Sequence, residues 1–212
     1  MLKLLDLFSG SGSVTTLARK IGYDVRSLDI IQLKNAPILT FKTDILHFNF
    51  KSELNDWIPD VIWCSPPCTE YSIAKTRAQR DIDGANSLVI TSINIIEYVM
   101  TKNPNLIWII ENPQTGLLKK QPFMQNLPFL DADYCCYGLP YRKRTRFWTN
   151  VKAKTKLCEG AGVCPFIERG TRRHIHNIGN GHTQYGRQFL TKEKYKIPED
   201  LILILLRPEI SV

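Results

Sequence analysis

The chain has 212 residues, 43% of them hydrophobic and 23% charged, and carries a formal net charge of +8 at pH 7. This size and composition predict one globular domain with a sizeable core, or one domain with a small attachment, and exclude a disordered, collagenous or coiled-coil protein. No apolar run approaches the roughly 18 residues that cross a bilayer, and the first residues lack a signal-peptide pattern, so we expect an intracellular, cytoplasmic protein.

Apolar segments typical of buried strands alternate with segments of helical periodicity over the first 110 residues. We expect strands at residues 2–7, 24–30, 40–44, 60–64 and 106–110, and helices at residues 14–21 and 87–100. Two further strands are expected at residues 133–137 and 146–150, and a final helix at residues 198–206. This alternation predicts an α/β fold with a mostly parallel sheet covered by helices on both faces.

The positive charge is concentrated late in the chain. Residues 142–198 hold 14 lysines and arginines but only 3 acidic residues. Such a basic segment favours a polyanionic partner, most simply a nucleic acid, although a solubilising surface has the same composition. We divide the chain into a main domain (residues 1–150), a short basic insertion rich in Gly, Cys and His (residues 151–186), and a segment that packs back on the main domain (residues 187–212).

The loop after the first strand has the composition of a ligand-binding turn. Its glycines, Gly10 and Gly12, let the backbone approach a ligand closely, and the helix that follows offers free N–H groups. The third glycine of the dinucleotide fingerprint and the Gly-Lys-Ser/Thr of a P-loop are both missing, so a methionine-type cofactor with a ribose fits better. Asp29 and Asp44 end the next two strands, where they can accept from ribose hydroxyls and an adenine amino group, or simply cap turns.

Two further strands end in residues that carry chemistry. Pro66 and Pro67 form a stiff turn that holds Cys68 at the carboxyl edge of the sheet, where a thiol can act as a nucleophile. Cys64, at the strand end, is interpreted as core, although a metal pair with Cys68 is an alternative. Glu111 follows four apolar residues at the same edge and can hold a proton, accept from a substrate amino group, or cap the next element.

Taken in order, these segments resemble the cytosine-C5 DNA methyltransferases. The matches cover most of the chain and follow the family's order: Asp6-Leu7-Phe8-Ser9-Gly10-Ser11-Gly12 for its S-adenosylmethionine loop, Pro66-Pro67-Cys68-Thr69-Glu70-Tyr71-Ser72 for its nucleophile motif, Glu111-Asn112-Pro113 for its Glu-Asn-Val, Tyr137 to Phe147 for its arginine motif, and Arg187 to Glu193, loosely, for a late motif. The first four matches each follow an expected strand, and together they make a specific pattern.

The resemblance implies a Rossmann-like S-adenosylmethionine-dependent methyltransferase that methylates C5 of cytosine in double-stranded DNA. It implies that Cys68 forms a covalent bond to the base, that Glu111 contacts the ring, and that Arg144 and Arg146 position the base and backbone. The target base must leave the helix, and the basic loop of residues 70–86 would close as a lid. The residues that the resemblance assigns to cofactor binding are Asp6, Phe8, Ser9, Gly10, Gly12, Ser13, Asp29, Ile30, Asp44 and Pro66.

This chain departs from the family pattern in several places. Thr69 replaces a Gln, Pro113 replaces a Val, and Arg142 stands where the family has a Gln, with one extra residue before it. The region available for target recognition, residues 151–186, is also short. We therefore expect an enzyme that reads few bases or is aided by an accessory protein, acts as a monomer without a membrane, and belongs to a prokaryotic or phage-type setting, where it serves restriction–modification, defence evasion or regulation.

Cysteine and histidine residues gather in the basic insertion. Six cysteines in a chain of this length without a signal peptide do not indicate a disulfide framework. Cys158, Cys164, His174 and His176 can form a tetrahedral structural zinc site that stabilises a segment without its own core. The five residues between the cysteines are more than usual, and histidines beside arginines also suit phosphate contacts.

Two other functions stay open. A tRNA cytosine-C5 methyltransferase would keep the Pro-Pro-Cys motif and a small recognition region. A catalytically silent nucleic-acid-binding protein would keep the fold, although the presence of Cys68, Glu111 and the arginine pair disfavours it.

Overall fold

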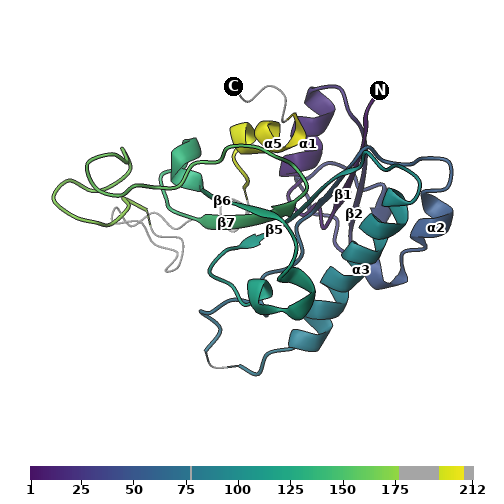
Figure 1. Cartoon of the computed structure of the whole chain (residues 1–212), viewed down its shortest axis with the longest axis horizontal. Helices are drawn as coiled ribbons and strands as arrows, with labels where there is room; N and C mark the ends of the chain where they lie inside the picture. Colours follow the sequence, from purple (N-terminus) through teal and green to yellow (C-terminus); the bar gives the residue numbers. More distant parts are fainter. Residues whose placement is uncertain (77, 177–195, 208–212) are drawn as a thin grey trace.

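Figure 1 shows the computed structural model of the chain, which describes residues 1–76, 78–176 and 196–207. One seven-stranded sheet runs through it, in the order β3-β2-β1-β4-β5-β7-β6. Its strands are β1 (Lys3–Leu7), β2 (Asp24–Asp29), β3 (Phe41–Lys42), β4 (Val61–Cys64), β5 (Ile107–Pro113), β6 (Phe129–Asp133) and β7 (Arg144–Thr149).

The sheet is mostly parallel, as predicted. The pairs β1–β2, β2–β3, β1–β4 and β4–β5 are parallel, whereas β7 lies antiparallel to both β5 and β6. The central strands are short and apolar, and all four residues of β4 are buried. Strands buried on both faces need helices on each side of the sheet.

Helices cover both faces (Figure 1). On one face lie α1 (Ser13–Lys20) and α5 (Glu199–Leu206), which contribute Leu17 and Leu205 to a single apolar cluster. On the other lies α3 (Ile82–Met100), which buries Val89 and Val99. The remaining helical elements are short: α2 (Phe50–Glu53) and the 3₁₀ turns η1 (Ile45–His47), η2 (Leu118–Lys120), η3 (Pro122–Met124) and η4 (Tyr134–Tyr137).

Two expected element boundaries were wrong. Residues 133–137 do not form a strand, because β6 ends at Asp133 and a 3₁₀ turn follows, closed by Gly138 in the left-handed conformation (φ 85°). The turn buries Tyr134 and returns the chain toward β7. Helix α3 begins at Ile82 rather than residue 87, because the Asp81 side chain accepts from the Gly84 N–H and caps it.

Residues 151–176 contain no helix or strand and extend beyond the β6–β7 edge of the sheet (Figure 1). The late motif at residues 187–193 lies outside the described residues. The expected boundary between the basic insertion and the last segment, at residue 186, lies outside them too, as does His182, a further histidine of that insertion. None of the helices in the described ranges has both the length and the apolar character required to span a bilayer.

Candidate active site

The loop between β1 and α1 is a tight turn with unusual backbone angles. Phe8, Gly10 and Gly12 all have positive φ, at 60°, 51° and 75°. At Gly12 a side chain is also excluded sterically, since a Cβ atom would lie 2.3 Å from Cδ of Pro37. The turn therefore depends on glycine at this position, both for its positive φ and for the close approach of Pro37.

Asp6, in β1, supports this loop through hydrogen bonds to α1. The carboxylate is 1% exposed and accepts from the backbone N–H and hydroxyl of Thr15, at 3.2 and 2.6 Å, in the first turn of α1. Burial, only partly offset by these two hydrogen bonds, raises the pKa of Asp6 to about 7. Asp6 thus connects β1 to α1 and helps to fix the conformation of the glycine loop between them.

The two acids at the ends of β2 and β3 have local hydrogen-bond partners. Asp29 accepts from the Gly10 N–H at 2.9 Å and from the Ile31 N–H, so it connects β2 to the glycine loop. Ile30, beside it, is 58% exposed. Asp44 caps η1 by accepting from the Leu46 N–H. Both acids therefore cap turns, at the edge where the cofactor was expected.

The Pro-Pro-Cys turn is fastened to the neighbouring strands. The Ser65 N–H donates to the carbonyl of Leu7, and the Asn112 side chain donates to the carbonyl of Pro66 at 2.9 Å. Cys64 is fully buried in the core, as predicted, and burial raises its pKa strongly. Cys68 lies beyond the strand end and is partly exposed.

Cys68, Glu111 and Lys143 form an electrostatic group at this edge. Burial raises the pKa of the Cys68 thiol, the Glu111 charge raises it further, and the Lys143 ammonium lowers it. Glu111 is 7% exposed, accepts from the Tyr134 hydroxyl at 3.4 Å and lies 3.6 Å from Lys143 Nζ. The sequence thus predicted the thiol and the carboxylate correctly as neighbours, whereas it gave Lys143 no role.

The two arginines of the motif lie on the other face of the sheet. In the β5–β7 register Arg146 stands opposite Asn112, and Glu111 stands opposite Phe147. Because side chains alternate along a strand, Lys143 shares the Glu111 side of β7, and Arg144 and Arg146 do not. The alternation along residues 143–147 can be followed in the sequence, but the β5–β7 register that places Lys143 on the Glu111 side cannot.

Each arginine makes a two-pronged ion pair with a carboxylate of β6. Arg144 donates to both oxygens of Asp133, the shortest bond being 2.6 Å, and Arg146 donates to both oxygens of Asp131 at 2.8 Å. Arg146 also stacks on the ring of Phe129. Their expected contacts with base and backbone remain a prediction.

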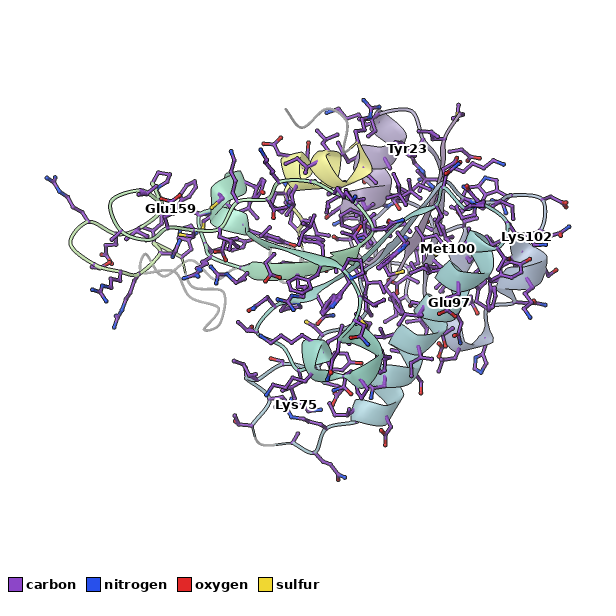
Figure 2. All side chains as sticks on the ribbon, in the orientation of Figure 1. Tyr23, Lys75, Glu97, Met100, Lys102 and Glu159 are labelled. Carbon is purple, nitrogen blue, oxygen red and sulfur yellow. The ribbon has the colours of Figure 1, made fainter. Side chains whose placement is uncertain are left out.

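The loop before α3, expected to act as a basic lid, is organised by its own residues. Arg80 donates to the carbonyls of Glu70, Ser72 and Lys75, and Lys75 pairs with the Glu70 carboxylate. Figure 2 shows Lys75 on this loop, far from Glu159 on the extended basic segment. The loop carries three basic residues, Lys75, Arg77 and Arg80; Lys75 and Arg80 are thus paired within the loop, and Arg77 lies outside the described residues.

A small pocket opens beside the thiol. Its lining residues are Cys68, Ser72, Ile73, Asn112, Pro113, Thr115 and Gly116. Within the described residues, Asn112 Oδ1 is buried without a hydrogen-bond partner. Asn112, which lines the pocket together with Cys68, therefore has an amide oxygen whose hydrogen-bonding capacity is unused.

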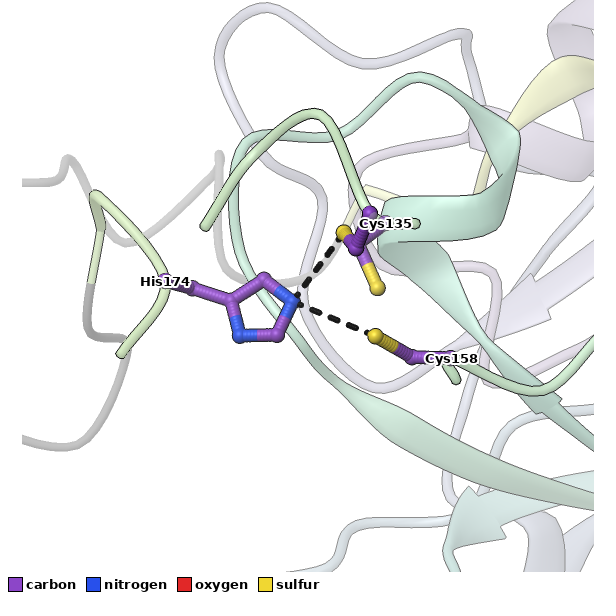
Figure 3. Close-up of side chains that lie close together, drawn as sticks. Cys135, Cys158 and His174 are labelled. Atoms are coloured by element: carbon purple, nitrogen blue, oxygen red, sulfur yellow. Dashed lines mark hydrogen bonds between the residues drawn. The ribbon is translucent and has the colours of Figure 1, made fainter. Parts of the chain in front are cut away.

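The expected zinc ligands were partly wrong. Cys158, Cys164 and His174 do come together, but their fourth neighbour is Cys135 of η4, and all four ligand atoms lie within 4.8 Å of one another. His176 is not in this group; its backbone forms a β-bridge with Tyr141. Figure 3 shows the His174 ring turned toward the Cys158 sulfur, with Cys135 beside them. The sequence could not indicate Cys135, which lies 23 residues before Cys158 in another element.

Comparison with known proteins gives one clear relative. No family model matches the chain. A curated protein of Frog virus 3 (isolate Goorha), named probable DNA (cytosine-5)-methyltransferase, is 30% identical over 225 residues, covering 97% of this chain and 99% of that protein. The chain belongs to the DNA (cytosine-5)-methyltransferase family.

Solved structures show the same Rossmann-like methyltransferase fold. A DNA modification methyltransferase encoded within an E. coli prophage has a TM-score of 0.52 at 21% identity, over 73% of this chain and 49% of that one. The S. pombe Dnmt2 methyltransferase has a TM-score of 0.53 at 17% identity, over 77% of this chain and 58% of that one. The chain spans only about half of the length of these larger family structures.

Proposed function

We propose that this protein methylates C5 of cytosine in duplex DNA, with S-adenosylmethionine as methyl donor and Cys68 as covalent nucleophile. The observation that carries the proposal is the position of Cys68. A stiff turn at the carboxyl edge of the sheet presents this thiol beside the carboxylate of Glu111 and the ammonium of Lys143.

The residues around the glycine loop fit S-adenosylmethionine. Gly10 and Gly12 give the loop the positive φ angles of a tight turn before a helix N-terminus, and Asp29 and Asp44 stand as acceptors at the ends of the next two strands. Phe8, Ser9, Gly10, Ser13, Ile30 and Pro66 complete the expected contacts. When bound, this cofactor supplies an electrophilic methyl group on a sulfonium.

The side chains at the edge account for the remaining chemistry. The Cys68 thiolate adds to C6 of the cytosine ring, which turns C5 into a carbon nucleophile able to take the methyl group. Protonated Glu111 donates its proton toward N3, while its other oxygen accepts from the exocyclic amino group, so the proton offsets the negative charge that builds on the ring as sulfur adds to C6. A base then removes the C5 proton, and the C6–S bond breaks to release Cys68 and the 5-methylcytosine.

Lys143 helps Cys68 to lose its proton. In the structure burial and Glu111 both favour the neutral thiol, so an ionised nucleophile needs a nearby positive charge. Lys143 provides that charge and also neutralises part of Glu111 at 3.6 Å. We therefore add Lys143 to the expected functional residues as a positioning and charge-balancing group.

DNA binding is assigned to the basic late part of the chain. Residues 142–198 carry a net positive charge that suits phosphate contacts. The cytosine has to swing out of the duplex to reach Cys68, as in other enzymes that act on bases. With so short a recognition segment, the enzyme reads few bases by itself or uses an accessory protein; a bisulfite profile with six or more fixed bases for the isolated protein would contradict this.

The proposal is tested by trapping the adduct. The protein is incubated with tritiated S-adenosylmethionine and duplex DNA that contains 5-fluorocytosine, in which fluorine blocks the loss of a proton from C5. A labelled covalent complex is expected with wild type and with Cys136→Ser, and none is expected with Cys68→Ala. Adduct that persists in Cys68→Ala overturns the mechanism.

The same assay separates the alternative substrates. A complex on fluorinated tRNA but none on DNA assigns the enzyme to RNA. Binding of both nucleic acids, with neither labelled, would support a silent binding protein and contradict methyl transfer.

A further inference from the structure

The Cys/His cluster joins segments that are otherwise connected by hydrogen bonds and by little apolar contact. Cys135 belongs to η4 on the main domain, whereas Cys158, Cys164 and His174 come from the segment of residues 151–176, which contains no helix or strand. In this segment only Val151 is part of a buried apolar cluster, with Ala153 partly buried against it. A segment with so little apolar burial needs another source of order.

The two distances from the His174 ring to cysteine sulfurs match those of a tetrahedral metal centre. His174 Nε2 lies 3.6 Å from Cys158 Sγ and 3.5 Å from Cys164 Sγ. Zinc bonds of about 2.3 Å to sulfur and about 2.0–2.1 Å to nitrogen, arranged tetrahedrally, place sulfur and nitrogen ligands about 3.6 Å apart. All four ligand atoms fall within 4.8 Å, so one ion reaches each of them.

We propose that Cys135, Cys158, Cys164 and His174 bind one structural zinc ion that fastens the basic segment to the main domain. Three thiolates and one imidazole form a closed four-ligand set, with no position left for a substrate water. Within the part of the chain that the structure describes, this is the one group of side chains in metal-ligand geometry.

The surroundings of the site connect it to the arginine motif. The Cys158 N–H donates to Asp133 Oδ2 at 2.9 Å, and the same carboxylate receives Arg142 and Arg144. Hydrogen bonds of this kind orient metal ligands. The zinc ion thereby fixes the position of the basic segment relative to β6 and β7, so its loss is expected to weaken DNA binding and leave cofactor binding unchanged. This last consequence rests on the proposed function; the zinc site itself does not.

Metal content tests the site without any activity measurement. Elemental analysis of protein purified without chelators is expected to give one zinc per chain, and cobalt replacement to give the visible absorption of a tetrahedral thiolate site. Cys135→Ser and His174→Asn should each lose the metal, whereas the adjacent controls Cys136→Ser and His176→Asn should retain it.

Three results would overturn the site: zinc far below one equivalent, zinc retained in Cys135→Ser, or a disulfide between two of the three cysteines found by mass spectrometry of unreduced protein. If Cys135→Ser fails to fold, the wild-type protein can be titrated with a thiol-modifying reagent in the presence of a zinc indicator. The site predicts that one equivalent of zinc per chain is released as the cysteines react.

The role of the ion is tested separately. Cys135→Ser is expected to bind a duplex oligonucleotide at least tenfold more weakly in fluorescence anisotropy and to bind S-adenosylmethionine as well as Cys136→Ser does. If the protein contains zinc but its affinity for DNA does not change when the zinc is removed, only the proposed fastening role is contradicted. No DNA binding by wild type would count against the proposed function and leave the metal result intact.

Discussion

The carboxyl group of Asp6 gives a direct prediction about stability and pH. Asp6 is 1% exposed between β1 and α1, and burial raises its pKa from the ordinary value of 3.8 to about 7. The folded chain therefore keeps a proton that the unfolded chain releases at much lower pH. Asp6→Asn replaces this carboxyl with an amide that cannot ionise and whose oxygen can still accept from Thr15.

The size and sign of the effect follow from linkage. Because the folded-state pKa lies above the unfolded-state value, the stabilising proton is fully present below about pH 4 and is lost as pH rises to about 7. A rise from 3.8 to about 7 corresponds to about 4 kcal/mol, of which about 3 kcal/mol falls between pH 5 and pH 8. The Asn variant should gain that amount relative to wild type over this range.

Urea unfolding of both proteins at pH 5, 6, 7 and 8 measures the difference, in which the titration of all other groups cancels. Thr15→Val is the matched control: it removes a donor that lowers the pKa of Asp6, so the wild-type loss of stability should persist and extend to higher pH. A difference between wild type and Asp6→Asn that does not change with pH would refute the reasoning.

Two other predictions concern the cofactor loop and the nucleophile. Gly12→Ala should weaken S-adenosylmethionine binding at least tenfold in calorimetry, because the added Cβ atom clashes with Pro37 at a backbone φ of 75° that alanine rarely adopts. The control is Gly22→Ala, which has a φ of 93° and open space around it, and which should keep its cofactor affinity. Lys143→Met should raise the pKa of Cys68, so its alkylation by iodoacetamide, followed by peptide mass spectrometry, should shift to higher pH. An unchanged profile, or one equally shifted in Arg142→Met, would contradict that role.

Ion pairs between β6 and β7 stabilise the edge of the sheet. Asp131 and Asp133 on β6 each hold an arginine of β7, so the two outer strands are joined by charge as well as by backbone hydrogen bonds. Partly buried two-pronged pairs have good geometry and cost more when one partner is removed than a surface pair does. The arginines therefore stabilise β7, which Lys143 immediately precedes.

Local sequence signals predicted most of the fold, because they reflect burial and turn chemistry that act over a few residues. The apolar run of β4, the glycine loop after β1 and the proline turn before Cys68 each indicated their own structure, and parallel strands bring their carboxyl ends to one edge. The start of α3 was missed because its cap, Asp81, precedes the apolar periodicity. Residues 133–137 were mistaken for a strand because a buried 3₁₀ turn has similar composition.

The sequence by itself determined the fold class, the glycine loop after β1 and the proline turn that carries Cys68, since each depends on contiguous residues whose order alone carries the signal. Only the tertiary structure decided which side chains meet across elements. The pleat of β7 brings Lys143 to Glu111 and turns Arg144 and Arg146 away. The return of the chain after β7 brings Cys135 to Cys158, Cys164 and His174. Such meetings depend on register and chain path over distances that no local pattern records.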